Sequence, residues 1–345
     1  GTVINNTVNA TFQNETSGLL SAIATAATTV NNPSVFNNTN ITGCPVTINE
    51  SASMSGNITA NNSCVMFGND NITLDCNGNT IFYNARGNQY ESAITASGRN
   101  NITVINCILR DISSSGSVVK AINFTRTNSS RIENNTIITN GTDNNYGIEL
   151  MLNSYYNQIN RNNITSVGTT NDDYGIRLFS SARNNITGNT IKTGGSIADY
   201  GISIESTSTN NTFNYNNIST AGDTSYGIYI SLSTDNRFNA TLLNDTSEWL
   251  YNDVTSSTRL SNTTFACPSG SINLPNTITL STFFDISKAK LNVTYNKAFL
   301  NSSNLTALNT TGIITIYGIN YTSPLPSVDF TDANTFVHCP PGICT

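Results

Sequence analysis

The chain has 345 residues, of which 37% are hydrophobic and only 10% are charged, with a formal net charge of −6. Ordinary soluble domains have roughly 45–50% apolar and about 25% charged residues. The few, mostly acidic charges exclude a nucleic-acid-binding protein, and no apolar run approaches the roughly 20 residues of a membrane span. Regularly spaced Ile, Val and Tyr argue against disorder, because disordered chains are poor in β-branched and aromatic residues.

Residues 1–43 carry no repeat and predict an N-terminal arm with a helical cap. Apolar residues alternate with polar ones, apart from Asn6, as in an amphipathic strand. These residues are Ile4, Val8, Ala10 and Phe12. From residue 19 to 30 the apolar spacing is close to helical, and Asn31-Asn32-Pro33 ends the run. The segment either covers the first repeat that follows or leaves its own subunit and adds a strand to a neighbour.

Residues 44–250 contain an internal repeat of 26–28 residues. Its first phrase recurs as Tyr146-Gly-Ile-Glu-Leu, Tyr174-Gly-Ile-Arg-Leu, Tyr200-Gly-Ile-Ser-Ile and Tyr226-Gly-Ile-Tyr-Ile. Asn-rich phrases follow each copy, for example Asn185-Ile-Thr-Gly and Asn189-Thr-Ile. Each repeat thus holds three short segments of alternating apolar residues, which indicates strands.

Three such strands cannot bury an apolar face alone, but stacked coils can. The repeat therefore predicts an all-β protein, a right-handed parallel β-helix over residues 44–250. The coils resemble those of the pectate-lyase-like superfamily of parallel β-helix proteins. The opening passage, with Asn71-Ile-Thr-Leu-Asp-Cys-Asn-Gly-Asn-Thr-Ile81, resembles the first coils of repeat-rich secreted surface proteins, many of them archaeal. The resemblance indicates the fold and leaves the activity open, because the superfamily includes enzymes, binding proteins and structural rods.

Residues 251–345 lose the repeat and contain six prolines. We expect a C-terminal β domain or irregular terminal coils there. Trp249, the only tryptophan, lies at the junction and is expected in the core.

The seven cysteines form no paired CxxC metal motif. The chain begins at Gly1 without a leader, so we expect a mature secreted product, in which disulfides are favoured. The best pair is Cys44 with Cys64. Cys339 and Cys344 bracket a Pro-Pro-Gly turn and are a second candidate pair. Buried, reduced cysteines are the alternative.

Asn-x-Ser/Thr sites are dense, and N-glycans are expected on several of them. Some sites belong to the Asn-Ile-Thr strands of the repeat, so the informative ones lie elsewhere. These glycosylation candidates are Asn5, Asn9, Asn14, Asn239, Asn244, Asn262, Asn292, Asn301, Asn304 and Asn309.

Candidate chemistry lies on the outward face of the first strand of each coil. The register predicts an outward column of Thr95, Asn123, Glu149, Arg177, Ser203 and Tyr229. By the resemblance, a lyase would use Arg177 as a base, with Glu149 and Asp172 or Asp173 holding Ca²⁺. Ca²⁺ takes six to eight oxygen ligands, and an adjacent Glu–Arg pair is more typical of a salt bridge. We therefore expect no catalytic residue, metal or cofactor.

A column of tyrosines, Tyr146, Tyr174, Tyr200 and Tyr226, is the most regular feature. It either staples the coils together through ring contacts or forms a platform for sugar rings. Taken together, the sequence predicts a secreted structural protein of the cell surface, a glycosylated subunit that self-associates into a filament, sheath or surface layer. The alternative is a polysaccharide-active or glycan-binding β-helix that uses the column around Glu149 and Arg177.

Overall fold

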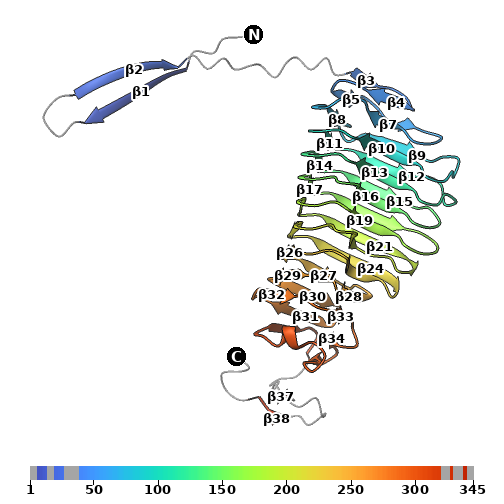
Figure 1. Ribbon diagram of the computed structural model, residues 1–345, viewed down its shortest axis with the longest axis vertical. Coiled ribbons are helices and arrows are strands. Elements are labelled where there is room, and N and C mark those ends of the chain that lie inside the picture. The colour runs from blue at the N-terminus through green and yellow to red at the C-terminus, as the bar shows by residue number, and fades with distance from the viewer. Residues whose placement is uncertain (1–5, 14–18, 27–38, 320–326, 329–336, 340–345) are drawn as a thin grey trace. The chain divides into compact units, whose positions relative to one another are not determined.

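The computed structural model describes residues 6–13, 19–26, 39–319, 327–328 and 337–339. The chain forms two compact units, residues 1–39 and residues 40–345, and Figure 1 shows the stacked coils of the second. Almost all regular structure is β-strand, and the described residues contain one short helix, the 3₁₀ helix η1 (Thr306–Leu308). None of the described helical structure has the length and apolar character needed to cross a membrane.

Three long sheets form the walls of the second unit, and each coil contributes one strand to each sheet. Sheet 1 has ten strands: β4 (Val46–Ile48), β7 (Val65–Phe67), β10 (Ser92–Ser97), β13 (Lys120–Thr125), β16 (Tyr146–Met151), β19 (Tyr174–Phe179), β22 (Ile202–Glu205), β25 (Tyr226–Ser231), β28 (Glu248–Asn252) and β33 (Phe284–Ile286). Sheet 2 has eleven: β3 (Thr39–Ile41), β5 (Ala52–Met54), β8 (Thr73–Asp75), β11 (Thr103–Ile105), β14 (Arg131–Glu133), β17 (Gln158–Asn160), β20 (Asn185–Thr187), β23 (Thr212–Asn214), β26 (Asn236–Asn239), β29 (Thr258–Ser261) and β32 (Ile278–Leu280). Sheet 3 has eleven: β6 (Ile58–Thr59), β9 (Thr80–Tyr83), β12 (Ile108–Asp111), β15 (Thr136–Thr139), β18 (Asn163–Val167), β21 (Thr190–Ile197), β24 (Asn217–Asp223), β27 (Leu242–Asn244), β30 (Thr263–Cys267), β31 (Gly270–Leu274) and β36 (Ile313–Ile316).

Strands of successive coils pair in parallel and in register, so the predicted parallel β-helix is confirmed. In sheet 1, for example, Ile122, Ile148 and Ile176 face one another across three neighbouring strands. All three side chains are fully buried and form part of a continuous axial core. The strict alternation of apolar residues therefore fills the interior, since neighbours along a strand point to opposite faces of the sheet.

The glycine of each Tyr-Gly-Ile phrase is required by the close packing of neighbouring coils. A Cβ added at Gly175 would lie 2.7 Å from the backbone oxygen of Gly201 in the next coil and would also strike Ile191. Gly147 and Gly201 have the same kind of neighbours. The glycine of the phrase thus marks a position at which any side chain would force adjacent coils apart.

Buried asparagines bond each bend of the chain to the next coil. The side-chain oxygen of Asn184 accepts the backbone N–H of Asn157 at 2.8 Å, and its amide nitrogen donates to the carbonyl of Ser154 at 3.0 Å and to Asn211 Oδ1 at 3.1 Å. A second ladder of this kind runs through Asn162 and Asn189. These ladders satisfy backbone groups that the bends remove from the sheets, which is required of buried polar groups.

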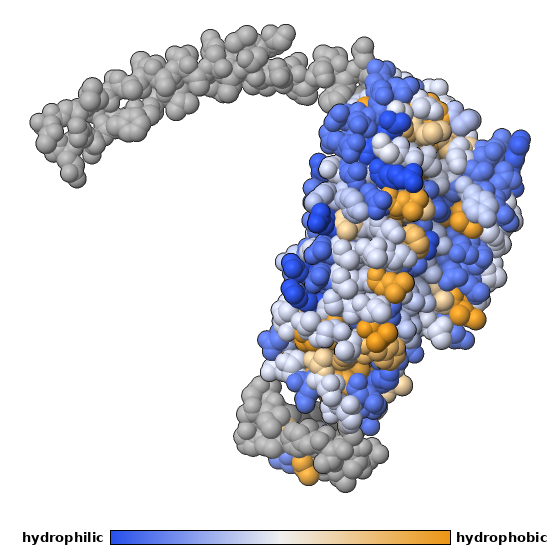
Figure 2. Space-filling model, in the orientation of Figure 1, coloured by the Kyte–Doolittle hydropathy of each residue, from blue (hydrophilic) through white to orange (hydrophobic). Residues whose placement is uncertain are grey.

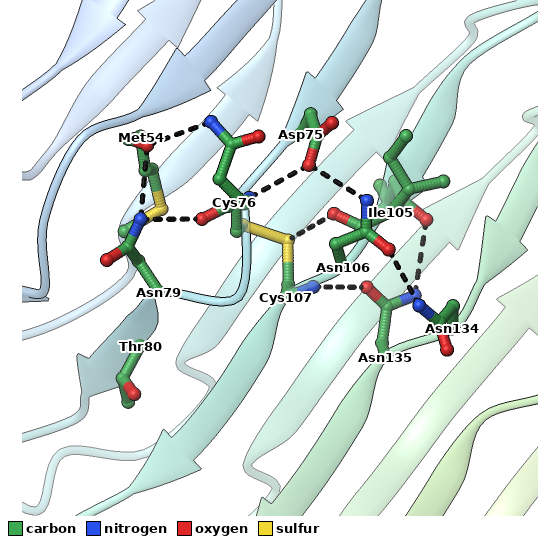
Figure 3. Close-up of a disulfide and its surroundings, with 12 residues drawn as sticks. Met54, Asp75, Cys76, Asn79, Thr80, Ile105, Asn106, Cys107, Asn134 and Asn135 are labelled. Atoms are coloured by element: carbon green, nitrogen blue, oxygen red, sulfur yellow. Dashed lines mark hydrogen bonds between the residues drawn. A yellow bond between two sulfur atoms is a disulfide. The ribbon is translucent and has the colours of Figure 1, made fainter.

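Two disulfides join the first coils. Cys44–Cys64 links the segments before β4 and β7, and Cys76–Cys107 links the ends of β8 and β11. Figure 3 shows the second one among bonds that also cross between coils, such as Asn106 Nδ2 to Asp75 Oδ1 at 3.1 Å and Asn135 Oδ1 to the N–H of Cys107 at 2.9 Å. The first coils are therefore held by covalent bonds in addition to the ladders.

The C-terminal end differs from the predicted boundary at residue 250. Parallel coils continue through β28, β29 and β30, and the chain then reverses at Pro268-Ser269. The next strands, β31, β32 and β33, pair antiparallel with β30, β29 and β28 respectively. One reversed coil thus closes the parallel stack, followed by the hairpin of β34 (Leu291–Thr294) and β35 (Lys297–Leu300) and by the edge strand β36. Trp249 lies in the core, as expected.

The N-terminal unit corrects the prediction of a helical cap. Residues 6–13 form β1 (Asn6–Gln13), and residues 19–26 form an antiparallel partner, β2 (Leu19–Ala26), instead of a helix. The helical spacing was misleading because pairing with β1 decides the structure of this short, Ala-rich segment, as tertiary context often does. Val8, Ala10 and Phe12 lie on β1, whereas Ile4 lies outside the described residues.

Candidate functional site

The outward column of sheet 1 has the register that the repeat predicts. Paired positions across the strands are Thr95, Asn123, Glu149, Arg177, Ser203 and Tyr229, and Tyr251 continues the column. A second column, two residues further along each strand, brings in Glu205 opposite Phe179. Charged residues of both columns meet around Arg177.

Glu149 is fully buried even though it points away from the core. Lys120 Nζ lies 2.5 Å from one of its carboxylate oxygens, and Arg177 Nη1 lies 3.0 Å from the other. The stems of these long side chains cover the carboxylate, and both cations keep less than a fifth of their side-chain surface exposed. Glu149 therefore has a cation on each side and is closed to solvent.

Arg177 is fixed on its other side by Glu205. The Nε and Nη2 atoms of Arg177 donate to the two oxygens of Glu205 at 3.1 and 3.0 Å, and Ser203 donates to the same carboxylate at 2.6 Å. Burial lowers the pKa of Arg177, but the hydrogen bonds and charge of Glu205 outweigh this and raise it above its ordinary value. A guanidinium held in this way stays protonated and cannot act as a general base.

Tyrosine rings form a continuous stack beside this charge network. Ring centroids of Tyr146, Tyr174 and Tyr200 are 5.1 and 5.0 Å apart with nearly parallel planes. The stack then moves to the outward column, through Tyr229 at 4.4 Å and Tyr251 at a further 5.0 Å. Tyr226 lies beside it with a tilted ring, 6.2 Å from Tyr200. Ring faces are covered by neighbouring rings, so this stack offers mainly ring edges to a sugar.

A second group of acids lies at the corner between sheets 3 and 1. The ladder position before each Tyr-Gly-Ile phrase is occupied by Asn145, Asp173, Asp199 and Ser225. Asp173 Oδ1 accepts the N–H of Asn145 at 2.9 Å, and Asp199 Oδ1 accepts the N–H of Asp173 at 3.1 Å. Burial, the largest cause in each case, raises the pKa of each carboxyl to about 7, partly offset by these hydrogen bonds. Both residues thus extend the hydrogen-bond ladder.

The acids considered for a Ca²⁺ site do not converge with Glu149. Asp172 accepts a hydrogen bond from the hydroxyl of Tyr174 at 2.8 Å, and Asp173 accepts the backbone N–H of Asn145 in the ladder. Within the described part of the chain, no three His, Cys, Asp or Glu side chains are grouped as a metal site requires. The single histidine, His338, is exposed on β38 (Val337–His338), which pairs with β37 (Ser327–Val328).

A shallow depression on the outer face of sheet 2 is lined by Thr103, Arg131, Glu133 and Arg161, among others. Glu133 forms ion pairs with both arginines. The arginine side chains are 51% and 71% exposed, whereas the side chain of Glu133 is 10% exposed, so only the cations of these pairs are open to solvent. Figure 2 shows a surface on which apolar residues form separate patches among hydrophilic ones.

The predicted glycosylation sites differ in their exposure, and the predicted cysteine pair of the C-terminal end is described only in part. Asn244, Asn262, Asn304 and Asn309 are exposed, and Asn239, Asn292 and Asn301 are half-buried. Asn9 lies on β1, whereas Asn5 and Asn14 lie outside the described residues. Cys339 is disulfide-bonded, and its predicted partner Cys344 lies outside the described residues. Cys267 is a free, half-buried thiol.

Sequence reasoning missed Lys120, Glu205 and the Cys76–Cys107 bond. A signal for the disulfide exists, because each cysteine follows an Asn-Ile-Thr phrase by three or four residues. Glu205 carries a weaker signal: it ends the strand of the Tyr200-Gly-Ile phrase, one coil beyond Arg177.

No family model matches the chain, and no curated protein matches it. Among solved structures, a double mutant of the periplasmic alginate epimerase AlgG is similar over 61% of this chain and 70% of its own, with 13% identity and a TM-score of 0.38. The A-module of the mannuronan C-5 epimerase AlgE4 of Azotobacter vinelandii covers 61% of this chain and 71% of its own, with 9% identity and a TM-score of 0.28. The Dettilon tailspike protein covers 58% and 56%, with 10% identity and a TM-score of 0.22. Likenesses this remote carry no argument on activity.

Proposed function

We propose that this protein is a structural subunit of an extracellular assembly at the cell surface, a glycosylated filament, sheath or surface layer built by self-association. Two disulfides fit an oxidising compartment outside the cytoplasm. The exposed Asn-x-Ser/Thr sites would carry N-glycans. This role agrees with the resemblance to repeat-rich secreted surface proteins. The proposal includes no catalytic step.

The observation that carries the proposal is the direction in which the polar side chains bond. Buried asparagines, serines and aspartates bond along the stack to the next coil, and Glu149, Arg177 and Glu205 do the same on the outward face of sheet 1. The tyrosine stack adds ring contacts in the same direction. Groups that an enzyme leaves free for its substrate are here used to hold coil to coil, which suits a rod under axial force.

Negative-stain electron microscopy of the native secreted material tests this role. Regular filaments or sheets are the expected result. Discrete rods at all concentrations would contradict it. Mass spectrometry of glycopeptides tests the second part, with glycan expected at Asn244, Asn262, Asn304 or Asn309. Finding all four unmodified would remove the glycoprotein claim.

A polysaccharide-active or glycan-binding β-helix is the second candidate. It is favoured by the aromatic groups at the end of the stack, where Tyr251 and Phe283 make an edge-to-face pair and Phe283 is 53% exposed. In that case the outward column of sheet 1 that contains Glu149 and Arg177 would be the surface that holds an acidic chain. Binding that is lost in Phe283→Ala and activity that is lost in Arg177→Ala would support it. No binding or cleavage across a broad polysaccharide panel would exclude it.

A further inference from the structure

Strand β36 forms the unprotected end of sheet 3. It pairs with β31 on one side and is the last strand of its sheet. Ile313 and Ile314 are 59% and 57% exposed, and Tyr317, directly after the strand, is 51% exposed. Successive residues point to opposite faces, so both faces of this edge are apolar and open. Ile314 shares its face with the buried Ile272, which places it at the end of the axial core.

Backbone groups on the outer side of β36 have no partner among the described residues. The N–H of Tyr317 donates to the carbonyl of Ser269 at 2.8 Å, which makes these two residues a hydrogen-bonded antiparallel pair. Bonded and non-bonded pairs alternate in such a ladder. Thr315 therefore bonds inward like Tyr317, and Ile314 and Ile316 direct their N–H and C=O groups outward. These groups form a ready template for an added strand.

Monomeric proteins protect such edges with charges, prolines or very short strands. Residues 312–319 contain no charged residue and no proline. Strands β1 and β2 are also free of charge and proline, and each is eight residues long. Each compact unit therefore has, among its described residues, an edge strand without charge or proline: β1 or β2 in the first and β36 in the second.

The β1–β2 hairpin pairs apolar residues at alternate positions. Val8 lies opposite Ala24, Ala10 opposite Ala22 and Phe12 opposite Leu20. A two-stranded hairpin is at best marginally stable alone in water. Twelve residues separate β2 from β3, a span of up to about 40 Å when extended. That length allows the hairpin to reach a neighbouring molecule.

We infer that β36 is the acceptor for the β1–β2 hairpin of a second copy of this chain, which extends sheet 3 across the subunit boundary. The added strands cover Ile314 at the end of the core. This inference rests on the proposed assembly and names its joint. Donor and acceptor are different surfaces, so the contact is head-to-tail and repeats without closing.

Four proteins test the joint: the wild type, Ile314→Lys, a deletion of residues 1–26, and Val254→Lys as the matched control. Val254 is 71% exposed on the turn after β28, away from any sheet edge, and receives the same charge. Sedimentation velocity and negative-stain microscopy should show polymers for the wild type and Val254→Lys and monomers for the other two. An equimolar mixture of the two defective proteins should give dimers and no longer species, because only one working joint remains.

Polymers from Ile314→Lys, or no dimers in the mixture, would overturn the inference while leaving a structural role intact. A wild type that never polymerises would instead refute the proposed function. Far-ultraviolet circular dichroism checks the fold of each variant. If Ile314→Lys does not fold, Ile313→Lys on the opposite face of β36 replaces it with the same expected result.

Discussion

Acidification should stabilise this protein through the buried pair Asp173 and Asp199. Both side chains are fully buried, and each leaves its Oδ2 atom without a partner in the described structure. The two carboxyls belong to neighbouring coils, and among the described residues neither has a Lys or Arg as ion-pair partner. Asp143 adds negative charge near both carboxyls, and Asp172 adds more near Asp199. The protonated forms are therefore favoured in the folded state.

The size of the effect follows from the pKa of Asp173, which rises from 3.8 to about 7. One pKa unit corresponds to about 1.4 kcal/mol, so ionising this carboxyl in the folded state costs about 4 kcal/mol. Its folded pKa lies above its unfolded pKa. The stability is therefore fully present below about pH 4, falls as the unfolded chain releases the proton, and levels off above about pH 7. Asp199 shifts in the same direction and steepens the fall.

Chemical denaturation between pH 3 and pH 8 measures how the free energy of unfolding depends on pH. The wild type should lose stability across that range, and Asp173→Asn should abolish about half of the slope because an amide does not ionise. Asp223→Asn, an exposed neighbour, is the control and should leave the slope unchanged. A wild-type stability that rises from pH 4 to pH 7, or an unaltered slope in Asp173→Asn, would show that the burial argument is wrong.

Three further substitutions test the packing of the coils. Asn184→Ala removes three buried hydrogen bonds and should lower the free energy of unfolding, measured in urea, by about 3–6 kcal/mol. The control Asn185→Ala, at the exposed neighbouring position, should leave this free energy almost unchanged. Equal losses of stability in the two variants would contradict the ladder argument. Cys107→Ser opens a disulfide that spans 31 residues and should lower stability by about 3–4 kcal/mol in the oxidised protein, with no difference from the wild type after reduction. Gly175→Ala should lower the midpoint temperature of thermal unfolding strongly, because the added Cβ meets the next coil. Gly56→Ala is the control and should not lower it, because the space around Gly56 is open. An unchanged midpoint in Gly175→Ala would mean that the coils can move apart.

The fold was predictable because the repeat is directly visible in the amino-acid sequence. Recurrence of Tyr-Gly-Ile every 26–28 residues predicts which residues stack, and the pairing of Glu149 with Arg177 follows directly. Burial of Glu149 was not predictable, since it depends on Lys120 from the previous coil and on long side chains that fold over the surface. Spacing along the chain predicts neighbours in a column but not the paths of flexible side chains between columns.

Both ends were harder to predict, for a physical reason. Within the repeat, each coil meets copies of itself, so the pattern is reinforced many times. The strand β2 and the reversed coil β31–β33 are each formed once, by pairing with a unique partner. A single short segment such as Leu19–Ala26 has no repetition to separate strand from helix. The turn at Pro268-Ser269 marks a break in the sequence without showing that the chain turns back.

The reversed coil also determines how long the rod can be. A stack of equivalent coils has no internal reason to stop, because every added turn of about 27 residues offers the same edge to the next. By pairing antiparallel, β32 and β33 present edges of opposite polarity that a further coil of the repeat does not match, and β31 is already paired with β36. Gene duplication could therefore lengthen or shorten the middle of this protein one coil at a time while the two specialised ends stayed unchanged. The molecule is in this sense an adjustable spacer, whose length evolution can vary without redesigning its terminal connections.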